Sequence, residues 1–261
     1  MQTPGRNALC SCGSGRKVKR CCAERAGNAS ASPQAAPAPA PLTLPAFFPR
    51  VLCALLAETG PMVSGTLARD SRTGDQLVMI VDPFRALVLH QFLLASLDIA
   101  GDVAECGVYK GGTALVPAGT LRDATSSKPL HLFDSFQGLP DTLPVDGPHR
   151  AGHFGDASLA LLRRRLEGFH YEVHPGFFSD TLASVSDHTF CFVHIDVDIF
   201  SSAVECTEWF YPRVPPGGVI VYDDYGFEST QGVRVAVDEF YARRPEHPIV
   251  MPTAQCIVIK R

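Results

Sequence analysis

The chain has 261 residues, of which 46% are apolar and 19% charged, and its formal net charge is −4. This length suffices for one α/β catalytic domain with a small appendage, and the apolar fraction suffices for a full hydrophobic core. The acidic balance gives no strong nucleic-acid signal, no apolar run approaches the roughly 18 residues of a membrane span, and the polar N-terminus argues against a signal peptide.

The first 26 residues predict a small zinc module. Cys10, Cys12, Cys21 and Cys22 form a C-x-C pair, an eight-residue spacer and a C-C pair. Four thiolates at this spacing match a closed tetrahedral zinc site, and so short a segment needs such a metal in order to fold. A disulfide cluster or a reactive tail is the alternative. The chain has nine cysteines, an odd number, and several lie in apolar segments, so we expect a cytoplasmic protein and bound zinc.

Charge and composition separate this module from the rest of the chain. Residues 1–26 hold six basic side chains and one acidic one, which leaves 17 basic and 26 acidic side chains for the remainder. Residues 27–45 consist mainly of alanine, proline and serine, a composition typical of a semi-rigid linker. We therefore expect a zinc module at 1–26, a linker at 27–45 and a catalytic domain at 46–261.

Residues 46–261 alternate short apolar runs with amphipathic helical patterns. This alternation predicts a doubly wound, Rossmann-like α/β fold with a mostly parallel sheet and helices on both faces. Ligands then bind at the carboxyl ends of the strands. We expect seven strands, at 102–106, 130–133, 171–174, 190–196, 218–224, 248–251 and 255–260, the last two paired as a hairpin. We expect helices at 46–58, 83–98, from about 112, and at 156–168, 201–213 and 231–243.

A glycine-rich turn after the first of these strands predicts a cofactor site. In DVAECGVYKGGT, Glu105 closes the strand and glycines lead into a helix. Glycine lets the backbone approach a ligand closely, although a tight turn without a ligand is the alternative. Asp134 follows the next strand, where a carboxylate can accept both ribose hydroxyls of a nucleoside. If the cofactor is S-adenosylmethionine (SAM), Glu105 would lie near its sulfonium or methionine end, and because SAM has no phosphates the chain needs no phosphate-binding loop. The candidate cofactor-binding residues are Glu105, Gly107, Gly111, Gly112, Thr113, Asp134, Ser135 and Asp156; Asp156 has a helix N-cap as its alternative role.

Three carboxylates at the ends of the next two strands predict a metal site. Asp196 ends the strand in HIDVDIF, and Asp223 and Asp224 end the strand in GVIVYDDY. Adjacent parallel strands would bring these carboxylates together, and a divalent cation would remove their mutual repulsion. Hard oxygen ligands with open positions suit Mg²⁺ or Mn²⁺. The alternative is that these side chains cap the helices that follow.

The same residues predict the chemistry of the site. A metal that chelates two adjacent substrate oxygens lowers the pKa of a hydroxyl and aligns it with the methyl group. Asp198 is our candidate for the general base. His194, His149 and His153 are competitors, and His194 fits a structural role better because it lies in an apolar strand. Residues 138–155 are expected to form a mobile lid.

Two parts of the chain resemble known families. DVAECGVYKGGTA, HLFDSFQGLP, HIDVDIFSS, YPRVPPGGVIVYDDYG and AVDEFY together resemble the macrocin-type sugar O-methyltransferases of macrolide and aminocoumarin antibiotic biosynthesis. This resemblance implies SAM and Mg²⁺ as cofactors, a sugar hydroxyl as acceptor and a homo-oligomer, with Asp196, Asp223 and Asp224 as metal ligands and Asp198 as the base. PGRNALCSCGSGRKVKRCC resembles the SEC-C motif, which implies a zinc module that docks on another macromolecule.

Two other functions fit the sequence. The same chemistry could act on a catechol-like phenol or another vicinal diol, because any such pair of oxygens could chelate the metal. The chain could also be an adaptor that works through its zinc module and carries a degenerate methyltransferase body. The complete set of aspartates argues against the adaptor.

Overall fold

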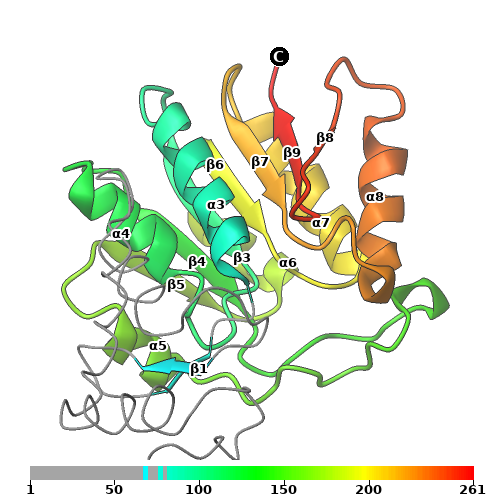
Figure 1. Ribbon diagram of the computed structural model, residues 1–261, viewed down its shortest axis with the longest axis horizontal. Coiled ribbons are helices and arrows are strands. Elements are labelled where there is room, and N and C mark those ends of the chain that lie inside the picture. Colours follow the sequence, from blue (N-terminus) through cyan, green and yellow to red (C-terminus); the bar gives the residue numbers. More distant parts are fainter. Residues whose placement is uncertain (1–66, 70–75, 79–80) are drawn as a thin grey trace, which may run out of the picture. The chain divides into compact units, whose positions relative to one another are not determined.

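The computed structural model describes residues 67–69, 76–78 and 81–261 (Figure 1). The predicted zinc module, the linker and the helix at 46–58 lie outside these residues and stay predictions. Strands β1 (Leu67–Arg69) and β2 (Gln76–Val78) pair antiparallel. Among the described residues, no helix is both long and apolar enough to cross a membrane.

The main sheet has seven strands in the order β5-β4-β3-β6-β7-β9-β8. The strands from β5 to β7 run parallel, and β9 is antiparallel to both β7 and β8. The strand order reverses between β3 and β6, the topological switch point at which open α/β sheets bind ligands. The predicted doubly wound sheet and its terminal hairpin are confirmed. The strands are β3 (Asp102–Cys106), β4 (Leu130–Asp134), β5 (Tyr171–Pro175), β6 (Phe190–Ile195), β7 (Val219–Tyr222), β8 (Ile249–Val250) and β9 (Cys256–Ile259).

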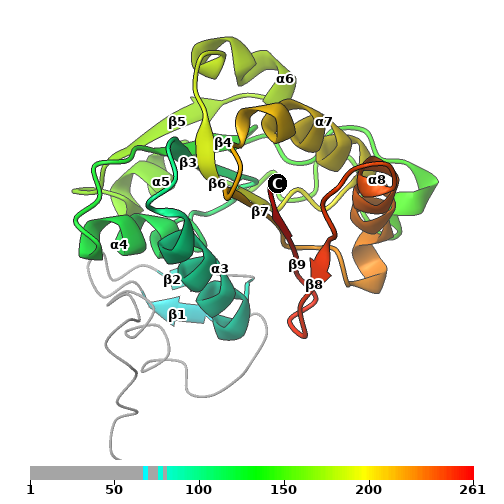
Figure 2. The ribbon, with the colours of Figure 1, turned by 90° about the horizontal axis from the view of Figure 1, so that it is seen from above.

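Helices cover both faces of this sheet (Figures 1 and 2). Alternate strand residues supply two cores, because successive side chains point to opposite faces. Leu132 of β4, for example, packs in the core with α3 and α4, whereas Phe133 packs in the core with α7 and α8. One face carries α3 (Pro83–Ser96), α4 (Leu115–Asp123) and α5 (Leu159–Arg165); the other carries α6 (Phe178–Thr181), α7 (Phe200–Phe210) and α8 (Gln231–Tyr241).

Helix boundaries differ from the predicted ones for local reasons. The helix expected from about 112 begins at Leu115, because the residues before it form the glycine loop. The helix expected at 156–168 is shorter, since Ser158 caps its start by accepting a hydrogen bond from the Leu161 N–H. Helix α7 ends at Phe210 and continues as a 3₁₀ turn over Tyr211–Arg213.

Candidate active site

A pocket lies at the carboxyl ends of β3, β4, β6 and β7, on the topological switch point. The glycine loop after β3 lines one part of it, and the acidic residues after β6 and β7 line another. Five of the predicted cofactor residues and three of the predicted acidic residues therefore share one cavity. They are Gly107, Gly112, Thr113, Asp134 and Ser135, together with Asp196, Asp198 and Asp224.

Gly107 shapes the loop through a close backbone approach. Its φ is +84°, and a Cβ atom there would lie 2.7 Å from the carbonyl carbon of Asp196 and overlap the carbonyl oxygen. We had expected glycine to permit the approach of a ligand; at this position it lets the end of β3 pack against the end of β6. Gly111, with a φ of +78°, instead makes room for the Leu162 side chain of α5.

Asp134 fixes this loop from the end of β4. Its Oδ2 accepts hydrogen bonds from the N–H groups of Val108 (2.9 Å) and Tyr109 (2.7 Å), and its Oδ1 accepts one from Phe136 (2.7 Å). Burial raises the pKa of Asp134 despite these three donors. A carboxylate has about four acceptor positions, so the three N–H donors leave about one of them open; binding of a ribose by Asp134 stays a prediction.

Three predicted cofactor residues lie outside the pocket lining: Gly111, Glu105 and Asp156. Glu105 is fully buried, with Oε1 3.5 Å from Nδ1 of His194, and burial raises the pKa of Glu105. Asp156 accepts a hydrogen bond from the Tyr109 hydroxyl (2.8 Å) and pairs with Lys110, so it holds the outer side of the glycine loop. The alternative role of Asp156 as a helix N-cap is wrong, because Ser158 takes that position.

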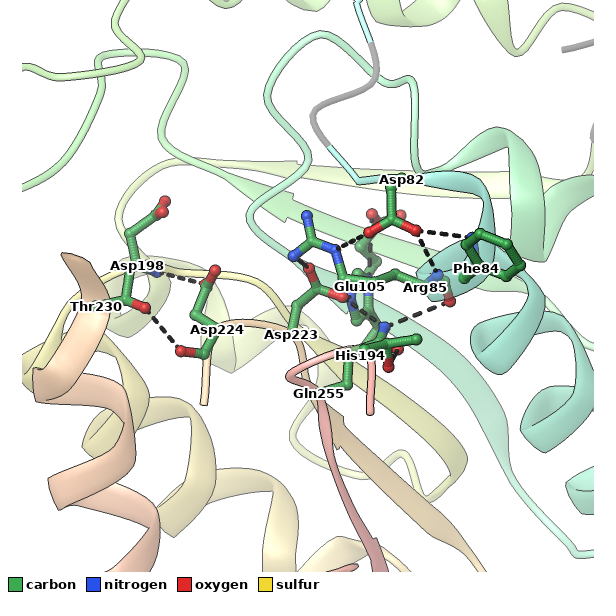
Figure 3. Close-up of polar contacts among 11 residues, drawn as sticks. Asp82, Phe84, Arg85, Glu105, His194, Asp198, Asp223, Asp224, Thr230 and Gln255 are labelled. Atoms are coloured by element: carbon green, nitrogen blue, oxygen red, sulfur yellow. Dashed lines mark hydrogen bonds and ion pairs between the residues drawn. The ribbon is translucent and has the colours of Figure 1, made fainter. Parts of the chain in front are cut away.

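The sequence suggests that Asp223 is one of three carboxylates without a positively charged partner. In the structure Asp223 is paired (Figure 3). Its Oδ2 forms an ion pair with Arg85 of α3. Its Oδ1 accepts a hydrogen bond from Nε2 of Gln255 (2.7 Å) and lies 3.3 Å from Nε2 of His194. Sequence reasoning missed Arg85, although it is the lone lysine, arginine, aspartate or glutamate in α3.

The buried charged residues near the pocket fall into two sets. The pKa of Asp223, in the first set, shifts in the opposite direction from the pKa values of the carboxylates that line the pocket. Burial would lower the pKa of His194, but the Asp223 and Glu105 carboxylates raise it to about 10. Burial would likewise raise the pKa of Asp223, but His194 and Arg85 hold it below its ordinary value. Asp223 is therefore ionised inside a buried cluster of charges.

The carboxylates that line the pocket behave in the opposite way. Burial, and then the neighbouring carboxylates, raise the pKa of Asp196 and of Asp198 well above the ordinary value. Burial and Asp223 raise the pKa of Asp224 to about 6. Hard oxygen donors that repel one another in this way fit a divalent cation. Oxygen atoms of Asp196 and Asp223 and a nitrogen of His194 also lie within 4.8 Å of one another.

Asp198 lies in a constrained turn directly after β6. Its φ is +62°, and its N–H donates to Oδ2 of Asp224 (3.2 Å). Tyr109 and Phe154, which also line the pocket, share the left-handed conformation, with φ values of 49° and 64°. Such conformations cost free energy in residues other than glycine and occur often at functional sites.

The segment 138–155 borders the pocket and is tied down at its centre. Asp146 is fully buried and accepts hydrogen bonds from the N–H groups of Leu143 and Phe200, both 2.7 Å. Leu139 and Phe154 line the pocket, whereas His149 and His153 do not. Movement of this segment as a lid stays a prediction.

The sheet, with a pocket at its topological switch point, defines a doubly wound, Rossmann-like α/β fold. A model of the macrocin-O-methyltransferase (TylF) family matches residues 88–259, so the chain belongs to that family. The SEC-C motif matches residues 6–24. Both resemblances drawn from the sequence are confirmed.

Curated relatives are O-methyltransferases of Streptomyces and Micromonospora species. The chain is 30% identical over 165 residues to a demethyldecarbamoylnovobiocin O-methyltransferase of Streptomyces niveus. The aligned region covers 56% of this chain and 60% of the relative. It is 28% identical over 160 residues to a mycinamicin III 3″-O-methyltransferase of Micromonospora griseorubida, covering 56% and 62%. The chain thus spans about three fifths of the length of these relatives.

Solved structures share the fold. The O-methyltransferase NovP superposes with a TM-score of 0.60 at 24% identity, over 70% of this chain and 81% of NovP. A calicheamicin methyltransferase superposes with a TM-score of 0.59 at 17% identity, over 69% and 81%.

Proposed function

We propose that this protein is an O-methyltransferase that moves a methyl group from SAM to a hydroxyl of a sugar or another natural product, as in antibiotic biosynthesis. The observation that carries the proposal is the shared pocket. The glycine loop with Asp134 lines one part of it, and Asp196, Asp198 and Asp224 line an adjoining part. A cofactor on the loop would thus lie next to an acceptor held beside the carboxylates. Family membership and the named activities of the relatives support the same reaction.

The glycine loop would hold SAM. Gly107, Gly112, Thr113, Asp134 and Ser135 form the cofactor side of the pocket, and Asp134 keeps one acceptor position for a ribose hydroxyl. Glu105 and Asp156 would act from outside the pocket. Glu105 belongs to the buried charge cluster behind the loop, and Asp156 holds the loop through Tyr109 and Lys110.

The acidic side would hold Mg²⁺ or Mn²⁺. Asp196 and Asp224 face the pocket as ligands, and Asp223 can join them once Arg85 gives up its ion pair. When bound, the metal polarises the acceptor hydroxyl and lowers its pKa. Two ligand positions on adjacent substrate oxygens would also suit a catechol-like or other vicinal-diol acceptor.

Asp198 is the proposed general base. Its carboxylate borders the pocket beside the metal ligands, and burial raises its pKa, which suits a group that takes up a proton. Asp198 would take up the proton of the acceptor hydroxyl as the methyl group passes from the sulfur of SAM to that oxygen, which would leave S-adenosylhomocysteine and the methyl ether.

The N-terminal module completes the proposal. Cys10, Cys12, Cys21 and Cys22 would bind a structural Zn²⁺, and the module would dock on a protein partner. The SEC-C match over residues 6–24 supports this assignment. We also propose a cytoplasmic homo-oligomer.

Turnover with isotopically labelled SAM tests the reaction. The full chain is incubated with glycoside and diol acceptors across a Mg²⁺ titration. We expect Asp198→Asn to lower turnover by about 10²–10⁴-fold, with unchanged SAM affinity and no rescue by Mg²⁺. Asp224→Asn should instead regain part of its activity at high Mg²⁺. Asp98→Asn, at an exposed position, is the matched control.

Three results would contradict parts of this proposal. Rescue of Asp198→Asn by Mg²⁺ would make Asp198 a metal ligand, and unchanged turnover would leave it without a catalytic role. Absence of calorimetric SAM binding by the folded parent protein would exclude the methyltransferase function itself.

A further inference from the structure

A second group of metal-binding side chains lies away from the active site. Asp102 is the first residue of β3, His131 is the second residue of β4, and His188 precedes β6. All three lie toward the amino ends of the strands, whereas the active-site pocket opens at the carboxyl ends. None of the three lines that pocket.

The spacing of this group suits zinc. Oδ2 of Asp102 lies 3.3 Å from Nε2 of His131 and 2.7 Å from Nδ1 of His188. The ligand atoms of the three residues all lie within 4.8 Å of one another. A tetrahedral zinc ion with bonds of about 2.0–2.1 Å holds its ligand atoms about 3.3–3.4 Å apart. Small side-chain movements would therefore bring all three atoms onto one ion.

The hydrogen bonds behind His131 fix its tautomer. The Ser184 hydroxyl donates to the carbonyl of Thr181 (2.8 Å), so it accepts from Nδ1 of His174 (3.0 Å). Nε2 of His174 then accepts from Nδ1 of His131 (3.0 Å). A neutral imidazole carries a single N–H, so Nε2 of His131 presents a lone pair to the Asp102 carboxylate. Two acceptors face each other there unless a cation lies between them.

A proton is a poor candidate for that cation at neutral pH. His131 is fully buried, and burial lowers its pKa even though Asp102 opposes the shift. Burial and the neighbouring His131 lower the pKa of His174 to about 4, so the His174 ring does not hold an additional proton at neutral pH either. A metal ion needs the neutral imidazole that these shifts favour, and metal-bound histidines commonly donate their other N–H to a fixed acceptor, as His131 does.

We propose that Asp102, His131 and His188 bind one Zn²⁺ at this end of the sheet. Two imidazole nitrogens and one carboxylate oxygen form a ligand set that suits Zn²⁺. The side chains of Asp102 and His188 are 22% and 38% exposed, so the ion can enter and can keep water in a fourth position. The bound ion would connect the loop before β6 to strands β3 and β4. None of these three residues belongs to the cysteine motif or lines the active-site pocket.

Zinc and cobalt titrations of the metal-stripped full chain test the proposal. We expect the parent to bind one more equivalent of Zn²⁺ than His188→Gln, which keeps the buried His131 in place. Asp102→Asn should weaken zinc at this site by about 100-fold or more, since even outer partners of a ligand contribute 10–100-fold. His247→Gln, at an exposed histidine just before the edge strand β8, is the matched control. In the cobalt form, bands of a nitrogen–oxygen site should vanish in His188→Gln, while thiolate charge-transfer bands of the cysteine module stay.

The parent and the variants share the same cysteine module. The difference in zinc binding between them therefore reports on the proposed site, whatever metal the cysteine module binds. Equal zinc stoichiometry and affinity in the parent, His188→Gln and Asp102→Asn would overturn the proposal, as would an equal loss in His247→Gln. A cobalt spectrum that is the same in the parent and in His188→Gln would also overturn it. Calorimetric binding of SAM to each variant confirms that the variant is folded.

Discussion

Replacing Gly107 by alanine tests the packing of the loop against β6. Gly107 and Gly168 have nearly the same left-handed backbone, with φ values of +84° and +81°, but a Cβ atom at Gly168 meets nothing within 4 Å. An alanine costs about 1–2 kcal/mol at either position because of this conformation. At Gly107 the new Cβ also overlaps the Asp196 carbonyl, and the Asp196 N–H donates to the carbonyl of Cys106 (2.9 Å). Displacing that peptide should cost a further 2–5 kcal/mol or so, from strain and a weakened hydrogen bond.

Urea unfolding of the two variants separates these contributions. We expect Gly168→Ala to lose about 1–2 kcal/mol and to bind SAM like the parent. Gly107→Ala should lose at least twice as much and should lose SAM affinity, because the loop and Asp196 move together. A Gly107→Ala variant that is too unstable to purify agrees with this reasoning. Stabilities of the two variants within about 1 kcal/mol of each other, with SAM affinity retained in both, would refute it.

Three further predictions concern buried carboxylates. Asp223→Asn should lower the free energy of unfolding by about 3–5 kcal/mol, because Arg85 loses its buried partner; Asp223→Asn with Arg85→Met should recover part of that loss in urea unfolding, and strictly additive losses would contradict the pairing. Asp134→Asn should weaken calorimetric SAM binding by about 1.5–3 kcal/mol, since one amide oxygen cannot serve all the N–H donors of the loop; unchanged affinity would exclude this role. Burial would raise the pKa of Glu246, but the Arg261 N–H and other donors hold it below its ordinary value. The parent should therefore be more stable than Glu246→Gln above about pH 4.5, and the difference should shrink as the pH falls further; a difference in urea midpoint that is constant with pH would contradict this.

The fold was predictable because its signal is local. Most strands of the main sheet are short apolar runs, with the exception of β5 (YEVHP), and strand and helix patterns alternate along the chain, so the seven-stranded sheet could be predicted without a structure. Asp134, Asp196 and Asp224 could be placed near one another for the same reason, because parallel strands bring their carboxyl ends to one edge.

Side-chain partners could not be predicted in this way. Arg85 precedes Asp223 by 138 residues, and their pairing depends on how α3 packs on β7. His131 and His188 meet Asp102 only because of the sheet register and the path of a loop. Asp156 seemed suited to a helix start, but the helix begins later and leaves it free to hold Lys110. Packing between distant segments decided each of these contacts.

Gln255 has a consequence for the order in which the site is assembled. It precedes β9, and its amide donates to Asp223, which also pairs with Arg85 of α3. One carboxylate is thus held by two segments that lie far apart in the sequence. Because chains emerge from the ribosome N-terminus first, a nascent chain holds Arg85 and Asp223 before it can close this cluster. The cluster around Asp223 should therefore form only when β9 has docked, and fraying of β9 should open it before the rest of the sheet unfolds.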